Sequence, residues 1–220
     1  MKMSEYQQYA VRTSAFYRNQ VSPYSGGIAI NDVGRRLLTA SYGLAEEWSE
    51  GVLGLVKKTL GHGHPFPVEK ASKELGDVLW YLSELTSACG KEMADQEFDE
   101  CQQLVCAQIG DWKYIPQPNE FTPESLDFHV HIANAIRASS GIVQLVHLMV
   151  CHGQRTPMTA LFRAIIDNTN FWFMLVGVLG LSAEKVALDN IAKLKARYPA
   201  GFETAKSIDR AAEEAPVLGG

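Results

Sequence analysis

The sequence has little of what marks secreted or membrane-spanning proteins. Its four cysteines form no C-x-x-C pair and have no histidines at zinc-ligand spacing, which favours free thiols over a disulfide framework. Residues 1–17 carry charges and no apolar stretch, so no signal peptide is predicted. The longest apolar run, over 171–181, contains two glycines and is too short to cross a bilayer. We therefore expect a cytoplasmic protein with no membrane partner.

Positive charge is also scarce. The chain has 20 Lys and Arg residues against 25 Asp and Glu, a net charge of −5. A nucleic acid polymer is therefore not an expected partner, because such proteins normally carry a basic surface. An acidic protein can still bind a small polyanion through a divalent cation. With 220 residues, the chain can bury a substantial core as one domain or two small ones.

The two-residue alternation of β-strands is absent, and helical spacing of three and four residues replaces it. Apolar residues at this spacing predict one helix over 31–60, which begins at Asn31 or Asp32 and ends at Gly61 and Gly63. A second helix is predicted from Pro67 to about Cys89, since proline is favoured in the first helical turn.

Three further helix starts have N-cap signals. Thr122 and Thr156 each precede a proline, and Ser182 is predicted to cap a last helix that ends before Pro199. Residues 110–121, with two prolines and no periodicity, are predicted to be a linker. Together these patterns predict an all-α fold.

The sequence also resembles itself at an offset of 90 residues. Residues 43–106 match residues 133–196 at thirteen of 64 positions, whereas chance would give about four. The bland alternative is that any two amphipathic helices look alike, but the interhelix pattern His-Gly-x-x-x-Pro at 62–67 recurs at 152–157. We predict a fused pair of helical units, residues 1–110 and 111–220, packed as one pseudo-two-fold bundle.

Two pairs of carboxylates stand out in the first unit. Glu47 and Glu50 lie three residues apart beside buried positions of the first helix, and Glu74 and Asp77 repeat this spacing in the second. Antiparallel packing would bring the four together, where like charges repel unless a cation neutralises them. Oxygen-only ligands suit Mg²⁺ or Mn²⁺. Acids that simply face water are the alternative. A di-iron site is excluded because no histidine follows a glutamate by three residues.

Residues 43–50 (GLAEEWSE) and 73–82 (KELGDVLWYL) resemble the E-x-x-E … E-x-x-D signature of MazG-like all-α nucleoside triphosphate pyrophosphohydrolases. Tyr6, Arg12 and Thr13 near the N-terminus and residues 190–199 (NIAKLKARYP) are similar to the same family. The resemblance is poor in the middle of the chain. In a typical short member the last helix follows the E-x-x-D helix directly, whereas some 90 residues intervene here.

The resemblance implies magnesium-dependent hydrolysis of a nucleoside or deoxynucleoside triphosphate to the monophosphate and pyrophosphate. It implies metal binding by a set of four carboxylates: Glu47, Glu50, Glu74 and Asp77. Glu46 is a candidate, with Glu47, for orienting the attacking water or binding a further ion, or it is simply solvated. The candidates for binding the substrate, with cations for the phosphates and an amide for the base or ribose, are Lys57, Lys193, Arg197 and Asn190.

Two other functions remain open, namely a catalytically inactive nucleotide or metal sensor on the same scaffold and a helical adaptor. A homo-oligomer of the fused chain is also open.

The two units differ at the candidate site. At the offset of 90, the four glutamates 46, 47, 50 and 74 become Ile136, Arg137, Ser140 and Ala164, and only Asp77 keeps its partner, Asp167. Conversely, Asn190 and Lys193 correspond to Glu100 and Gln103. We therefore predict one site per chain, with metal ligands from the first unit and cationic contacts from the second.

Overall fold

The structure is a computed structural model that describes residues 1–14, 32–63, 65–110, 126–153 and 158–199. Within these ranges the chain is helical and has no strand, apart from one isolated bridge between Lys2 and Glu97. The all-α prediction is confirmed. The helix starts expected at Thr122 and Thr156 lie outside the described residues, as does the linker expected over 110–121, except for Gly110, which is the last residue of a helix.

The first long helix differs from its prediction. It runs as α2 (Asp32–Glu46), a π-helical turn η2 (Glu47–Val52) and α3 (Leu53–His62), instead of one uninterrupted α-helix. Within η2, the Ser49 hydroxyl donates to the Ala45 carbonyl oxygen at 2.6 Å, which competes with the backbone ladder of the helix. Short π segments often mark functional sites.

Two other helices lie where they were predicted, with ends that differ from the prediction by at most three residues. Helix α4 spans Val68–Ala88 with Pro67 as its N-cap. Helix α8 spans Ala183–Arg197, and the Ser182 hydroxyl caps it by accepting from the Lys185 backbone N–H at 3.1 Å. Periodicity and capping residues were sufficient to locate both helices, although the hydroxyls of Ser83 and Thr86 in α4 also donate to carbonyl oxygens four residues earlier.

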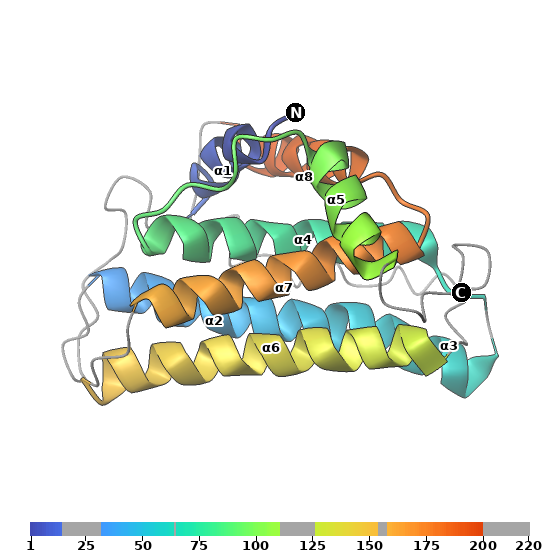
Figure 1. Cartoon of the computed structure of the whole chain (residues 1–220), viewed down its shortest axis with the longest axis horizontal. Helices are drawn as coiled ribbons and strands as arrows, with labels where there is room; N and C mark the ends of the chain where they lie inside the picture. Colours follow the sequence, from blue (N-terminus) through green and yellow to red (C-terminus); the bar gives the residue numbers. More distant parts are fainter. Residues whose placement is uncertain (15–31, 64, 111–125, 154–157, 200–220) are drawn as a thin grey trace, which may run out of the picture.

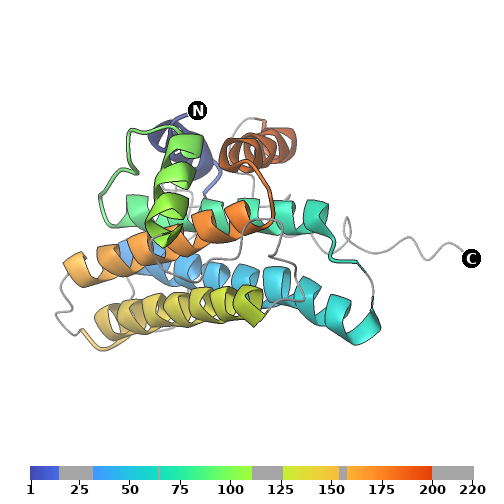
Figure 2. The same cartoon turned by 45° about the vertical axis from the view of Figure 1, so that its right-hand side comes forward.

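The long helices form a bundle. Helix α2 packs against α4 and against α6 (Leu126–Cys151), and α7 (Met158–Val178) closes the bundle by packing against both α4 and α6. The remaining helices, α1 (Met3–Val11), α5 (Phe98–Gly110) and α8, lie on the side of α4 and α7 that faces away from α2 and α6 (Figures 1 and 2).

The chain crosses between its two halves in this outer layer. Helix α8, from the second half, packs mainly on α4, whereas α5, from the first half, packs on α7. One continuous core joins the halves, and it includes Leu44 and Leu79 from the first half and Ile142 and Trp172 from the second. Trp48 is fully buried and donates through Nε1 to Asn168 Oδ1 at 3.0 Å.

Element bounds and turns recur at the offset of 90 residues. Helices α4 (68–88) and α7 (158–178) have the same bounds after this shift. Gly63 and Gly153 follow α3 and α6 with φ of 65° and 62°, and Gly90 and Gly180 follow α4 and α7 with φ of 66° and 67°. These are left-handed conformations, for which glycine is the favoured residue.

Two expectations from composition concern thiols and membranes. Cys89, Cys101 and Cys151 are free, as expected, and burial raises the pKa of Cys89 to about 11. No single described helix is long and apolar enough to cross a membrane, and only α7 and α8 pass such a test jointly, with a bend of 104° between them.

Candidate metal centre

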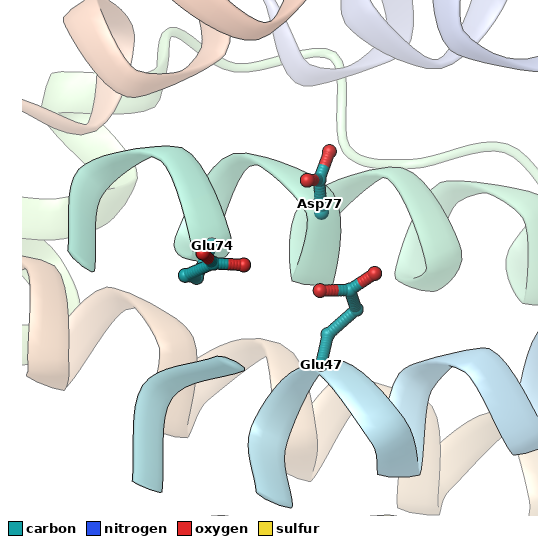
Figure 3. A group of neighbouring side chains, drawn as sticks. All are labelled: Glu47, Glu74 and Asp77. Carbon is teal, nitrogen blue, oxygen red and sulfur yellow. The ribbon is translucent and has the colours of Figure 1, made fainter. Parts of the chain in front are cut away.

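Three acidic side chains converge where η2 faces α4. Glu47 is the first residue of η2, and Glu74 and Asp77 lie one turn apart on α4 (Figure 3). One carboxylate oxygen from each lies within 4.8 Å of the others, and all three side chains are half-buried. Among the described residues, this is the one place where three metal-ligating side chains meet so closely.

Gly51 leaves room for these carboxylates. A Cβ atom at this position of η2 would lie 3.1 Å from Glu74 Oε2 and 3.5 Å from Glu47 Oε2. The first distance is shorter than ordinary van der Waals contact, so a side chain here would push against Glu74. The glycine therefore allows the acidic groups of both helices to share one space.

The structure does not bring Glu50 into the group. The spacing of Glu47 and Glu50 predicted a shared face because an α-helix turns about 100° per residue. Both residues lie in η2, where the wider π turn rotates less per residue and leaves Glu50 exposed. Glu46, the last residue of α2, is exposed as well. The roles of Glu46 and Glu50 stay predictions.

Two residues that were expected to bind the substrate, Asn190 and Lys193, contact Asp77 instead. Asp77 Oδ1 accepts hydrogen bonds from Asn190 Nδ2 at 3.2 Å and from the Lys193 ammonium group. Lys193 also forms an ion pair with this carboxylate, and the two side chains are 31% and 17% exposed. Because both partners belong to α8, the crossing of the last helix onto α4 completes the surroundings of this acid.

The amide of Asn190 is held in one orientation from its other side. The Tyr6 hydroxyl of α1 donates to Asn190 Oδ1 at 2.7 Å, which turns the Asn190 amino group towards Asp77. Burial, together with the negative charge of Asp77, raises the pKa of Tyr6 well above its usual value, so the phenol remains a donor. Gly76 allows this approach, since a Cβ there would lie 2.9 Å from Asn190 Nδ2.

Sequence reasoning missed Tyr6 as a site residue. Its hydroxyl belongs to a fully buried aromatic ring, and a tyrosine on an apolar stripe looks like ordinary core. The one available signal was that Tyr6 belongs to the N-terminal piece that is similar to the MazG-like family.

The other two candidate cations lie at different distances along their helices. Lys57 is exposed on α3, ten residues beyond Glu47, which is about 15 Å along a helix axis. Arg197 is half-buried, one turn beyond Lys193 on α8. Because Lys193 contacts Asp77, Arg197 lies closer to this acid along its helix than Lys57 lies to Glu47 along its own.

The corresponding positions in the second half form no group of acids among the described residues. Asp167, the counterpart of Asp77, is exposed on α7, and Arg137 on α6 is exposed at the counterpart of Glu47.

Comparison of the chain with protein-family models, with curated proteins and with solved structures gives no match. Functional inference therefore rests on the geometry of the three acids and their partners.

The residues present fit a hard divalent cation. All three ligand atoms are carboxylate oxygens, the type that Mg²⁺ and Mn²⁺ prefer. The three oxygens lie within 4.8 Å of one another, so they could hold one cation together after an inward movement of the side chains. The charge of the group also fits, since three close carboxylates repel one another and a cation between them would reduce that repulsion.

Proposed function

We propose that this protein is a hydrolase that cleaves nucleoside triphosphates, in the presence of Mg²⁺ or Mn²⁺, to the monophosphate and pyrophosphate. The observation that carries the proposal is the convergence of Glu47, Glu74 and Asp77 from two helices, with Lys193 at the edge of the group. Carboxylates that hold a cation beside basic side chains are what binding of a triphosphate requires. The resemblance of residues 43–50 and 73–82 to MazG-like enzymes selects this reaction among those that use such a site.

In this proposal, the three acids hold the divalent cation, which neutralises the phosphates and lowers the pKa of an attacking water when bound. Glu46 and Glu50, exposed beside the group, remain candidates for orienting the water or holding a second ion. Lys193 and Arg197 supply positive charge for the transferring phosphoryl group. Asn190 is fixed between Tyr6 and Asp77, so we assign it to positioning Asp77 before any contact with base or ribose.

We also infer that the chain is a fused pair of similar helical units with one composite site. The equal bounds of α4 and α7 after a shift of 90 residues support this inference, as do the paired left-handed glycines. The packing of α8 on α4 supports a site with metal ligands from the first unit and an ammonium group from the second. Titration with Mn²⁺ should then give one site of this kind per chain.

The direct test is incubation of the purified protein with a panel of nucleoside and deoxynucleoside triphosphates, with and without Mg²⁺, followed by product chromatography. We expect monophosphate and pyrophosphate only when the cation is present. Orthophosphate as the first product, or equal turnover in a metal chelator, would contradict the proposal. The panel also identifies the preferred base and sugar.

A second function is a metal or nucleotide sensor without turnover. The exposure of Glu46 and Glu50 favours it, because only three carboxylates converge where four were expected. A sensor would be stabilised against thermal unfolding by Mg²⁺ with a triphosphate, as mass action requires, but would release no pyrophosphate.

A further inference from the structure

The ammonium group of Lys193 pairs with a carboxylate that we propose as a metal ligand. It pairs with Asp77 Oδ1, the same oxygen that accepts from Asn190 Nδ2. Together, these two donors use both lone pairs that a carboxylate oxygen ordinarily offers. A divalent cation that binds the Asp77 carboxylate therefore competes with these donors for its negative charge.

We infer that Lys193 is an internal counter-ion, which occupies Asp77 when the metal is absent and is transferred to the substrate phosphates when the metal binds. This inference rests on the proposed function. It adds a role that phosphate contact alone does not include, namely competition between an ammonium group of the chain and the metal ion.

Electrostatics decides which donor leaves. An ammonium group beside a divalent cation is repelled, whereas the neutral Asn190 amide is not, and Asn190 is also held by Tyr6 at 2.7 Å. Lys193 is 31% exposed and has a flexible four-carbon stem, so its ammonium group can move while α8 stays in place. Lys193 is therefore the donor that exchanges.

The exchange couples the two ligands of the site. When a metal ion displaces Lys193 from Asp77, the ammonium group becomes available to bind phosphate. When phosphate binds this ammonium group, Lys193 no longer competes with the metal ion for Asp77. Each ligand then raises the affinity of the other by the same factor. In the absence of metal, Lys193 also reduces the repulsion among the three close carboxylates.

The test is a titration of the full-length protein with Mn²⁺ alone, followed by electron paramagnetic resonance of the free ion. Lys193→Met removes the competitor, so we expect Mn²⁺ to bind about three- to fivefold more tightly, the value of one partly exposed ion pair. Lys193→Arg keeps the charge and should bind Mn²⁺ as the wild type does. The matched control is Lys195→Met, which removes another ammonium group of α8, one that lies 4.6 Å from the centre of the Tyr9 ring.

A second titration, in the presence of a non-hydrolysable triphosphate analogue, measures the coupling. The analogue should raise the Mn²⁺ affinity of the wild type more than that of Lys193→Met. If Lys193→Met binds Mn²⁺ no more tightly than the wild type, the exchange is wrong even if the enzyme is active. If the wild type binds no Mn²⁺ at all, the metal centre itself is wrong. Circular dichroism without metal checks folding, and Lys193→Gln replaces the methionine variant if that one unfolds.

Discussion

Helices α4 and α7 occupy matching positions in the two halves of the bundle, yet only α4 carries a cluster of acids. Both helices have 21 residues. In each case a glycine in the left-handed conformation lies two residues beyond the end of the helix. On α4, Glu74 and Asp77 meet Glu47, whereas on α7 the corresponding positions are Ala164 and an exposed Asp167. The packing of the core and the conformation of the turns are thus similar in the two halves whether or not the acids are present.

The comparison extends to the helices that face them. Ser49 and Gly51 lie in the π turn η2, and their counterparts, Ser139 and Gly141, lie in a regular stretch of α6. A serine and a glycine are therefore not sufficient to open a π turn. The residue before this serine in the first half is Trp48, a fully buried indole that donates to Asn168, and its counterpart is Ala138.

The largest expected difference between the halves is in turnover. Asp77→Asn should lower the rate of triphosphate hydrolysis by at least about 10², the usual effect of losing one electrostatic contact to a transition state. Asp167→Asn, the matched change on α7, should leave the rate unchanged because Asp167 is exposed away from the acids of the first half. Steady-state kinetics at saturating Mg²⁺ measures both. Equal losses would mean that the second half contributes a site of its own.

A pair of glycines sharpens the comparison at the next level. Gly51→Ala places a Cβ 3.1 Å from Glu74 Oε2 and should weaken Mn²⁺ binding on the order of tenfold, as other changes beside metal ligands do. Gly141→Ala meets nothing within 4 Å and should instead stabilise α6 by about 0.5–1 kcal/mol, since alanine is the better helix former. Metal titration and thermal melts of both variants test the predicted loss of metal affinity and the predicted gain in stability. Unchanged metal binding by Gly51→Ala would argue against the placement of the acids.

The third prediction concerns α1, which supports the site of the first half only. Tyr6→Phe removes one hydroxyl without leaving a large cavity, and should weaken Mn²⁺ binding by a few-fold because the Asn190 amide is no longer fixed towards Asp77. It should also cost about 1–3 kcal/mol of stability, because a buried acceptor loses its partner. Ser14→Ala is the control. It removes a buried hydroxyl that donates to Glu84 at 2.6 Å, and should change stability but not metal affinity.

The smallest effects are expected where the halves agree. Gly63→Ala and Gly153→Ala each force alanine into a left-handed conformation with open space around it, at a cost of about 1–2 kcal/mol. The two losses should be equal, and neither should change turnover. Thermal or urea unfolding of the two variants provides the measurement. Clearly unequal losses would contradict the equivalence of the two turns.

Sequence reasoning succeeded where structure depends on local pattern. The bounds of α4 and α8 followed from apolar spacing together with Pro67 and Ser182, which act within one helical turn. It also placed three of the acids correctly in one group, because the E-x-x-D spacing on α4 holds in a regular helix.

Other features depend on contacts that no local pattern reveals. The π turn that separates Glu50 from Glu47 arises in the packed bundle, and the bond from Tyr6 to Asn190 joins residues 184 positions apart. Helix α5 was not among the predicted helices, since its apolar face is defined only by its packing on α7.

The crossing of α8 onto α4 also has a consequence for protein synthesis. Asp77 and Lys193 are separated by 116 residues. At the usual rate of about 5–20 residues per second, the ribosome makes Lys193 roughly 6–23 s after Asp77. Glu47, Glu74 and Asp77 therefore leave the ribosome well before the ammonium group that pairs with Asp77. During this interval the nascent first half has its acids but neither Asn190 nor Lys193, so the composite site that we propose could form only after the last helix is made.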